Sequence, residues 1–282
     1  MSTISIPANY YQQFDADFSL DIPAEGMGGW QKAEIEIDPE RTALVLMHAW
    51  DIGSREQYPG WFAACEEVPR TYHICRTVFP DLLSTVRASD LPLFHVVGGG
   101  DYYKEMPGYR RAAQLAGPPP PAPERIPSDP ALEALHRFRS DNVWVGSHNQ
   151  ADYRRGSPHR KFAREAVPKG DEGIAENAHQ LHALCREQGV NHLIYAGFDI
   201  NMCLTFSPGG MVDMQQRGYL CSTIREAITA CENKETARGE VAKEIALWQV
   251  AVNFGFVFDL DDLLATLSTD SSELSTRLAI AN

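Results

Sequence analysis

Cys203 is the residue of this sequence best placed to act as a nucleophile. An apolar, β-prone run (residues 193–196) ends at Gly197, a short polar turn follows, and Cys203 opens a segment that suits a helix. The first turn of a helix presents unpaired N–H groups and the positive end of the helix dipole, which stabilise a thiolate and any oxyanion beside it. A small buried residue in a strand-to-helix turn is the alternative interpretation.

A histidine follows another buried run. Residues 42–47 are continuously apolar after Thr42, which indicates a strand covered on both faces of a parallel sheet, and His48 comes directly after it. A neutral imidazole beside Cys203 could take the thiol proton, and the resulting imidazolium would lower the thiol pKa. The alternative is a histidine hydrogen-bonded at the end of a core strand. The carboxylates that could orient the imidazole are Asp51, Glu176 and Asp199.

Strand and helix patterns alternate along the chain. A helical pattern over 68–89, with Pro80 inside it, separates the first strand from a second apolar run at 91–97, and strand–helix–strand is typical of a parallel sheet. These patterns predict an α/β fold. Further helices are expected at 131–138, 176–188, 237–250 and 261–267, and further strands at 142–145, 190–196, 219–223 and 254–258.

The chain divides into an arm, a core with an insertion, and a tail. Residues 1–40 mix aromatic residues and glycines and are expected to form an arm, with an edge strand at 32–37. Residues 41–270 form the predicted α/β domain. Within it the pattern breaks down at 101–169, which contains four consecutive prolines and is interpreted as an insertion or lid. Residues 271–282 are expected to be a frayed tail.

Composition limits the classes of partner. The 282 residues carry 25 basic and 38 acidic side chains, a formal net charge of −13, which argues against binding nucleic acid or anionic membranes through bulk electrostatics. Six cysteines occur without a CxxC pair, so neither a zinc knuckle nor a redox dithiol is indicated. Scattered thiols, and the absence of a signal-like or long apolar segment, predict a soluble cytoplasmic protein.

The wording of the motifs resembles a known family. The run GVNHLIYAG (189–197), then INMCL (200–204), with RGY (217–219) and REA (225–227) after it, is similar to the nucleophile region of the isochorismatase-like cysteine hydrolases, which include nicotinamidases and carbamoylsarcosine amidohydrolases. The resemblance covers residues 42–267 apart from the insertion and is strong only between 189 and 227.

The resemblance implies a fold and a mechanism. The fold would be a Rossmann-like three-layer sandwich, with a mostly parallel central sheet flanked by helices. Such enzymes hydrolyse amides through an acyl-enzyme, using a triad of Asp, Lys and Cys and backbone amides near the cysteine to hold the oxyanion. By position these amides would belong to Met202 and Cys203. The family also carries a non-proline cis peptide before the cysteine motif, which by position would join Asp199 and Ile200.

Two positions of the triad depart from the family pattern. His48 stands where the Asp should be, and Asp51 is the nearest carboxylate that could replace it. The Lys position falls on Lys169 or on Glu176, depending on where a gap is placed. A metal site of the nicotinamidase kind would need Asp-x-His and a second His after the second strand, and none occurs there. No metal and no cofactor are therefore predicted.

Aromatic residues gather at the same edge of the predicted sheet. Trp50 follows the first strand and Tyr102 follows the second, and both strands end where open α/β sheets bind ligands. They predict a pocket for a small, planar or apolar molecule, although packing under a loop is an alternative. Further aromatic residues of this edge are Tyr58, Trp61, Phe62, Tyr103 and Tyr109.

The sequence thus leads to two hypotheses. The first is a cofactor-independent cysteine hydrolase that cleaves an amide or related acyl C–N bond of a small molecule. In it Cys203 is the nucleophile, His48 the base, Lys169 or Glu176 an assistant, and Met202, Asp199, Ile200, Trp50, Asp51 and Tyr102 line the substrate or oxyanion site. The second is a binding or scaffold protein that kept the fold and lost the chemistry. A homo-oligomer, dimer or tetramer, is expected in either case.

Overall fold

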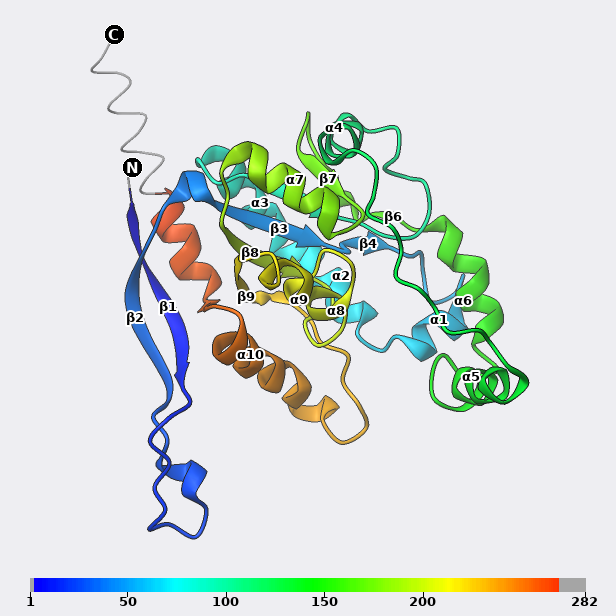
Figure 1. Ribbon diagram of the computed structural model, residues 1–282, viewed down its shortest axis with the longest axis horizontal. Helices are drawn as coiled ribbons and strands as arrows, with labels where there is room; N and C mark the ends of the chain where they lie inside the picture. Colours follow the sequence, from blue (N-terminus) through cyan, green and yellow to red (C-terminus); the bar gives the residue numbers. More distant parts are fainter. Residues whose placement is uncertain (1–2, 269–282) are drawn as a thin grey trace.

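The central element of the molecule is an eight-stranded sheet in the order β2-β1-β10-β9-β8-β3-β5-β7. We describe residues 3–268 of a computed structural model (Figure 1). Neighbouring strands from β10 to β7 are all parallel, and β1 and β2 add an antiparallel pair at one edge. The strands span Ile4–Gln12 (β1), Gly29–Ile37 (β2), Thr42–Met47 (β3), Leu93–Val96 (β5), Gly173–Ala175 (β7), His192–Gly197 (β8), Leu220–Ile228 (β9) and Val257–Phe258 (β10).

Helices cover both faces of this sheet, which confirms the predicted three-layer α/β class. In β3, Val45 and Met47 pack against one set of helices, whereas Leu44 and Leu46 point to the other. This alternation is the two-residue period of a strand, here apolar on both sides. The first set is α4 (Pro107–Ala116), α7 (Ala178–Gln188), α9 (Met211–Gln215) and α10 (Val241–Asn253), and the second is α2 (Val68–Thr77), α3 (Phe79–Ala88) and a helix at 260–268.

Local sequence explains where several helices begin and end. Pro80 lies in the first turn of α3, so the helical pattern over 68–89 is interrupted as its proline indicated, and it forms two helices that meet at Val78. Asn177 caps the start of α7 by accepting a hydrogen bond from Gln180 N, and Gly189 ends it in the left-handed conformation. The strand predicted at 142–145 is wrong, because α5 (Pro130–Asn142) continues to its first residue.

The N-terminal arm is a long hairpin. All nine residues of β1 pair with β2, and Asn9 of β1 lies opposite Val257 of β10, so the hairpin joins the central sheet at its edge. The edge strand expected at 32–37 is present as the second half of β2. The tail predicted at 271–282 lies outside the described residues.

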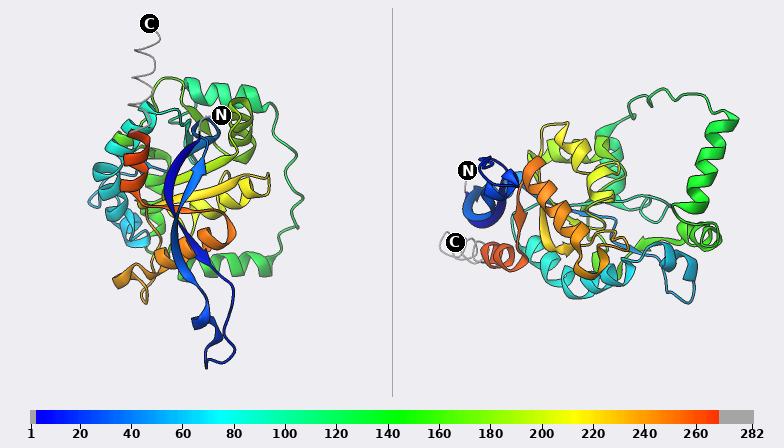
Figure 2. Two further views of the ribbon diagram at one scale, coloured as in Figure 1. Left: turned by 90° about the vertical axis from the view of Figure 1, so that its left-hand side faces the viewer. Right: turned by 90° about the horizontal axis from the view of Figure 1, so that it is seen from below.

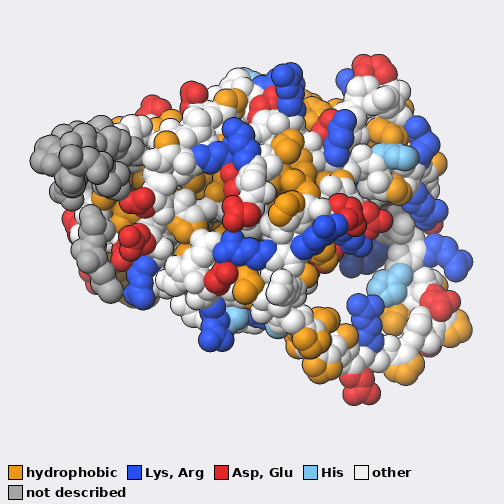
Figure 3. Space-filling model, turned by 90° about the horizontal axis from the view of Figure 1, so that it is seen from above, with side chains coloured by type: hydrophobic (Ala, Val, Ile, Leu, Met, Phe, Trp, Pro, Cys, Tyr) orange, Lys and Arg blue, Asp and Glu red, His pale blue; other side chains and the backbone are white. Residues whose placement is uncertain are grey.

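The insertion returns to the sheet after a wide excursion. Its segment 117–129 has no helix or strand and leads to α5, which has no buried residue and stands away from the body (Figure 2). The surface view shows the projecting segment (residues 117–142) with apolar and charged side chains interspersed, and a hollow between it and the body (Figure 3). The chain then forms α6 (Gln150–Gly156) and β6 (Lys161–Phe162), and β6 pairs with β4 (Trp50–Asp51), two residues after His48, in a separate two-stranded sheet.

Candidate active site

A cavity of about 670 Å³ opens where β3 and β8 end. His48 follows β3, and Asp199, Met202 and Cys203 follow β8, so parallel pairing of the two strands brings these residues to one wall. The close approach of the strands depends on Gly197, where a Cβ would lie 1.9 Å from the carbonyl oxygen of Met47. Its φ of +124° is likewise open only to glycine.

Cys203 lines the cavity at the start of a short helix, as its sequence context predicts. The helix is α8 (Cys203–Phe206), a single turn. Burial raises the pKa of the Cys203 thiol; a hydrogen bond with Ser207 lowers it, and the charge of Asp199 raises it again. The net direction is upward, so the resting side chain is a protonated thiol at neutral pH.

The predicted oxyanion amides are partly engaged within the chain. The N–H of Met202 donates to the carbonyl of Asp199 at 3.1 Å, and the N–H of Ile200 donates to the carbonyl of Thr229 at 2.8 Å. Neither is available to an oxyanion in this conformation, which corrects the prediction for Met202. The Cys203 amide is the candidate that we keep.

His48 lines the same cavity. It has a φ of +54°, and its ring stacks on Trp50 with 4.3 Å between the centroids. A left-handed conformation is uncommon for a residue other than glycine and is frequent at functional sites. Burial, and then the charge of Arg160, lower the pKa of His48 to about 3, so the ring is neutral. Its Nδ1 has no hydrogen-bond partner among residues 3–268, and no hydrogen bond in that range joins the ring to Cys203.

Trp50 also lines the cavity, but Asp51 and Tyr102 lie behind it. Tyr102 accepts a hydrogen bond from the Trp50 indole at 2.8 Å and so fixes the orientation of that ring. Asp51 accepts from Tyr72 at 3.1 Å and pairs with Lys161 at 3.3 Å. The carboxylate of Asp51 therefore does not replace the family Asp in the cavity wall.

The structure brings neither Lys169 nor Glu176 to the cavity. Lys169 is exposed, in a loop whose backbone N–H donates to Glu172. Glu176 accepts hydrogen bonds from Tyr103 at 2.5 Å and from Tyr109 at 2.6 Å, which hold its carboxylate under α4. Neither residue that gap placement could match to the family lysine therefore lines the cavity.

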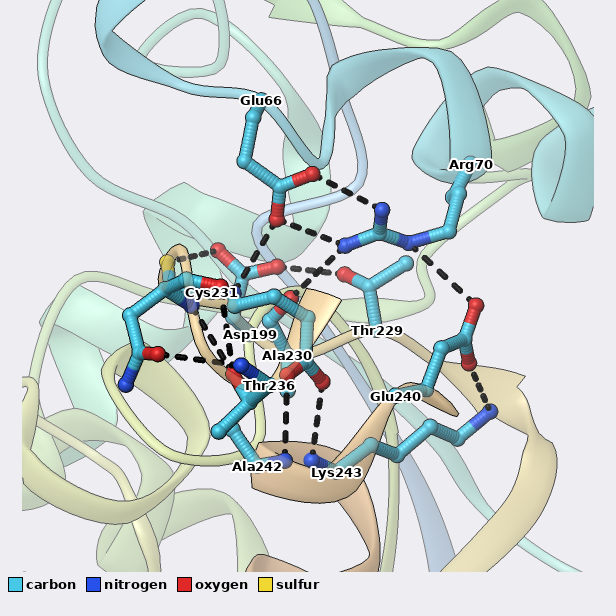
Figure 4. Close-up of polar contacts among 12 residues, drawn as sticks. Glu66, Arg70, Asp199, Thr229, Ala230, Cys231, Thr236, Glu240, Ala242 and Lys243 are labelled. Carbon is cyan, nitrogen blue, oxygen red and sulfur yellow. Dashed lines mark hydrogen bonds and ion pairs between the residues drawn. The ribbon is translucent and has the colours of Figure 1, made fainter. Parts of the chain in front are cut away.

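Beside the predicted Asp199, the cavity contains an acidic and a thiol group, Glu67 and Cys231, that sequence reasoning missed. Glu67 and Asp199 are both 8% exposed, and Cys231 lies beside them. Figure 4 shows the Cys231 sulfur next to Asp199, 3.4 Å from its Oδ2. Burial raises the pKa of both carboxyl groups; the charge of Asp199 adds to the rise at Glu67, and the charge of Glu66 adds to that at Asp199. Glu67 precedes α2 and Cys231 follows β9, so no local motif links them to Cys203. Only the order of the strands in the sheet would have placed Glu67 and Cys231 beside Cys203.

Two further aromatic walls complete the cavity. Trp61 and Tyr153 pack with their ring centroids 4.8 Å apart, and Trp144 lies 5.2 Å from Tyr153. Trp61 was among the predicted aromatic residues, whereas Trp144 and Tyr153 come from the insertion. The described residues contain two non-proline cis peptides, Trp144–Val145 and Phe198–Asp199. The second lies one bond before the position inferred from the family resemblance.

Comparisons with known proteins give structural likeness only. No family model matches this chain, and no curated protein matches it. A cysteine hydrolase from Pseudomonas syringae pv. phaseolicola has 14% identity and a TM-score of 0.46, with 83% of this chain and 95% of that chain covered. An isochorismatase-like hydrolase from Alkaliphilus metalliredigens has 15% identity and a TM-score of 0.43, with 80% and 98% covered. An N-carbamoylsarcosine amidase from Thermoplasma acidophilum has 13% identity and a TM-score of 0.37, with 78% and 97% covered.

These structures carry the names of the group that the motifs at 189–227 resemble. At such identities the argument for function rests on the cavity of this chain and on its residues. Within residues 3–268 no helix has the length and apolarity needed to cross a membrane.

Proposed function

We propose that this protein is a cysteine hydrolase that cleaves an amide or related acyl C–N bond of a small molecule at Cys203. The supporting observation is the position of this thiol, at the end of β8, in the wall of a cavity of about 670 Å³. Its place at a strand-to-helix junction of a parallel sheet is where such folds gather catalytic groups.

The proposed reaction has two steps. The Cys203 sulfur forms a bond to the acyl carbon while the thiol proton passes to the leaving nitrogen, and the C–N bond breaks. The neutral ring of His48 relays this proton, one ring nitrogen accepting as the other donates, because its pKa of about 3 excludes a stable imidazolium. Water next attacks the thioester, and the carboxylic acid and the free thiol are released. The Cys203 amide stabilises the oxyanion in both steps. Neither step requires a cofactor.

The cavity lining supports a substrate class. Trp50, Trp61, Trp144, Tyr153 and Phe198 supply aromatic walls, which suit a planar or apolar molecule. The lining also carries the carboxyl groups of Glu66, Glu67, Asp199 and Glu232. A neutral or cationic substrate is therefore favoured over an anionic one, which those groups would repel.

The test is hydrolysis of a panel of neutral and cationic aryl and alkyl amides. We expect wild type to release amine, and Cys203→Ala to lose at least about 1,000-fold in kcat/KM, because the covalent route is removed. Quenched intact-mass analysis should find the acyl group on Cys203. Cys65→Ser, which changes another thiol of the cavity, is the matched control and should keep turnover. Equal turnover by Cys203→Ala would reject the proposal.

The second candidate is an inactive binding protein with this fold. Three observations favour it: His48 replaces the family Asp, Glu176 is held by two tyrosines, and the pKa of Cys203 is raised. Iodoacetamide labelling across pH distinguishes the two candidates. Selective labelling of Cys203 near neutral pH supports the hydrolase, whereas labelling slower than that of a free thiol, without turnover of any amide, supports the binding protein.

A reducing compartment suits either candidate. Six free cysteines lie within residues 3–268, and both proposals need Cys203 as a thiol. We therefore keep the cytoplasm as the proposed location.

A further inference from the structure

We propose that Glu67, Asp199 and Cys231 form a binding site for a zinc-type divalent cation in the wall of this cavity. The site is separate in its chemistry from the proposed hydrolase, because it uses a different thiol and does not depend on acylation of Cys203. It also departs from the prediction, made from the sequence, that the protein holds no metal.

The spacing of the three donors fits one ion. One carboxylate oxygen of Glu67, one of Asp199 and the sulfur of Cys231 all lie within 4.8 Å of one another. Zinc binds sulfur at about 2.3 Å and carboxylate oxygen at about 2.1 Å, so a tetrahedral arrangement puts these two ligands about 3.6 Å apart. The observed distance between Asp199 Oδ2 and Cys231 Sγ is 3.4 Å.

Two buried carboxyl groups without a counterion suit a cation. Their side-chain partners are uncharged: Cys65 at Glu67, and Thr229 and Cys231 at Asp199. Buried carboxylates in proteins are normally paired or bound to metal. Within residues 3–268 neither Glu67 nor Asp199 forms an ion pair, although each is only 8% exposed. Arg70 is near, but it pairs with Glu66 and Glu240 and donates to the carbonyl of Ala230 (Figure 4). It therefore acts on Asp199 through space alone.

The surroundings hold the donors in place. Asp199 accepts hydrogen bonds from the Thr229 hydroxyl through Oδ1 and from the Cys231 thiol through Oδ2. A cation would take the place of the thiol proton: the S–H bond breaks, the proton leaves to solvent, and the thiolate and carboxylate bind the ion. Thr229 remains on the second oxygen and orients the ligand, as outer partners of metal sites do.

The donor set selects the kind of ion. A thiolate with two carboxylates suits zinc or cobalt(II), whereas magnesium and calcium prefer oxygen ligands alone. All three donors line the cavity, so the ion can enter from it. Three protein ligands leave the fourth tetrahedral position open to water or to a substrate oxygen.

The decisive measurement is cobalt(II) titration of the full chain after chelator treatment. We expect one ion per chain, intense visible bands of a tetrahedral ion and a near-ultraviolet thiolate-to-cobalt band, all lost when zinc displaces cobalt. Cys231→Ser should lose the thiolate band, and Asp199→Asn should weaken binding by more than about 100-fold, because even outer partners cost 10- to 100-fold.

Cys203→Ser is the matched control, since it removes a thiol of the same cavity outside the trio, whereas Cys65 contacts Glu67; it should keep the band. A negative result with wild type cannot be attributed to a variant that fails to fold. If it takes up no cobalt at stoichiometric concentration, or if Cys231→Ser keeps the thiolate band, the site does not exist. Loss of amide hydrolysis, with cobalt binding intact, would instead count against the proposed function alone.

Discussion

His48 and His192 are buried neutral imidazoles, and this makes the stability of the fold depend on pH. Burial and the charge of Arg160 lower the pKa of His48 to about 3, and burial lowers that of His192 to about 4. In the unfolded chain both would titrate near 6.5. At a pH between the folded and the unfolded pKa values, the unfolded chain binds protons at these two histidines and the folded chain does not. The free energy of unfolding therefore falls as the pH drops below about 6.5.

Replacement of His192 tests this linkage away from the cavity. His192 lies in β8 and contacts Ser222 at 2.8 Å and Thr42 at 3.4 Å. We expect His192→Gln to lose stability at pH 7, yet to lose less than wild type between pH 7 and pH 5, because one proton-linked group is gone. Urea unfolding at both pH values measures the two differences. Equal differences in variant and wild type would contradict the prediction.

Single residues were predictable from the sequence when a local pattern placed them. Cys203 and His48 each follow a buried strand, and parallel pairing then brought both to the cavity. Glu67 and Cys231 carry no local signal, because they come from different loops that meet only through the order of the strands. Glu176 follows β7 as the family pattern suggests, but its side chain is directed by two tyrosines of the insertion.

At the scale of elements, one carboxylate joins α3, β5 and the loop before β7. Glu172 accepts hydrogen bonds from Arg87 at 2.6 Å, from His95 at 2.9 Å and from the backbone of Lys169 at 3.0 Å. Burial opposes ionisation of Glu172, but the hydrogen bonds from His95 and Arg87 outweigh it and lower its pKa to about 2. His95, which is buried in β5, is therefore part of a structural contact.

We expect Glu172→Gln to destabilise the protein by about 3 kcal/mol, because it leaves the partly buried Arg87 without its counterion. Glu187→Gln, which breaks the more exposed pair with Arg111, should cost less than about 1 kcal/mol and serves as the control. Chemical denaturation of both variants gives the comparison. Similar losses for the two would mean that the contact does not join these elements.

Elements with one clear pattern were predictable, and those set by tertiary contacts were not. β3 has the bounds that its apolar run indicated, and α5 begins after Asp129, which caps it through hydrogen bonds from Ala131 and Leu132. The strand predicted at 142–145 rested on four residues, too few to separate a strand from a helix end. The strands β4 and β6 are two residues long and have no sequence pattern of their own. They form because the end of the insertion, which contains β6, lies beside β4.

At the scale of the whole molecule, the projecting segment (residues 117–142) that carries α5 exposes apolar side chains. Leu135 and Phe138 are both 64% exposed, and Ile126 is 80% exposed. Exposed apolar groups on one projecting segment are typical of a surface that meets a partner. Together with the proline-rich linker, they support the homo-oligomer that was predicted from the sequence.

Light scattering coupled to size exclusion tests this prediction. We expect a dimer or tetramer for wild type, and a shift toward monomer when Leu135 and Phe138 are both replaced by serine. The far-ultraviolet circular dichroism of that variant should match wild type, since neither side chain is buried. A monomeric wild type at micromolar concentration would overturn the prediction.

The pairing of Asn9 with Val257 orders events during synthesis. These partners are 248 residues apart, so the ribosome delivers the hairpin long before it delivers the strand on which the hairpin docks. At common bacterial and eukaryotic elongation rates the delay is about 12 to 50 s. For that time the edge of β1 that later meets β10 has no partner strand, and an unpaired edge is a template for association with other chains.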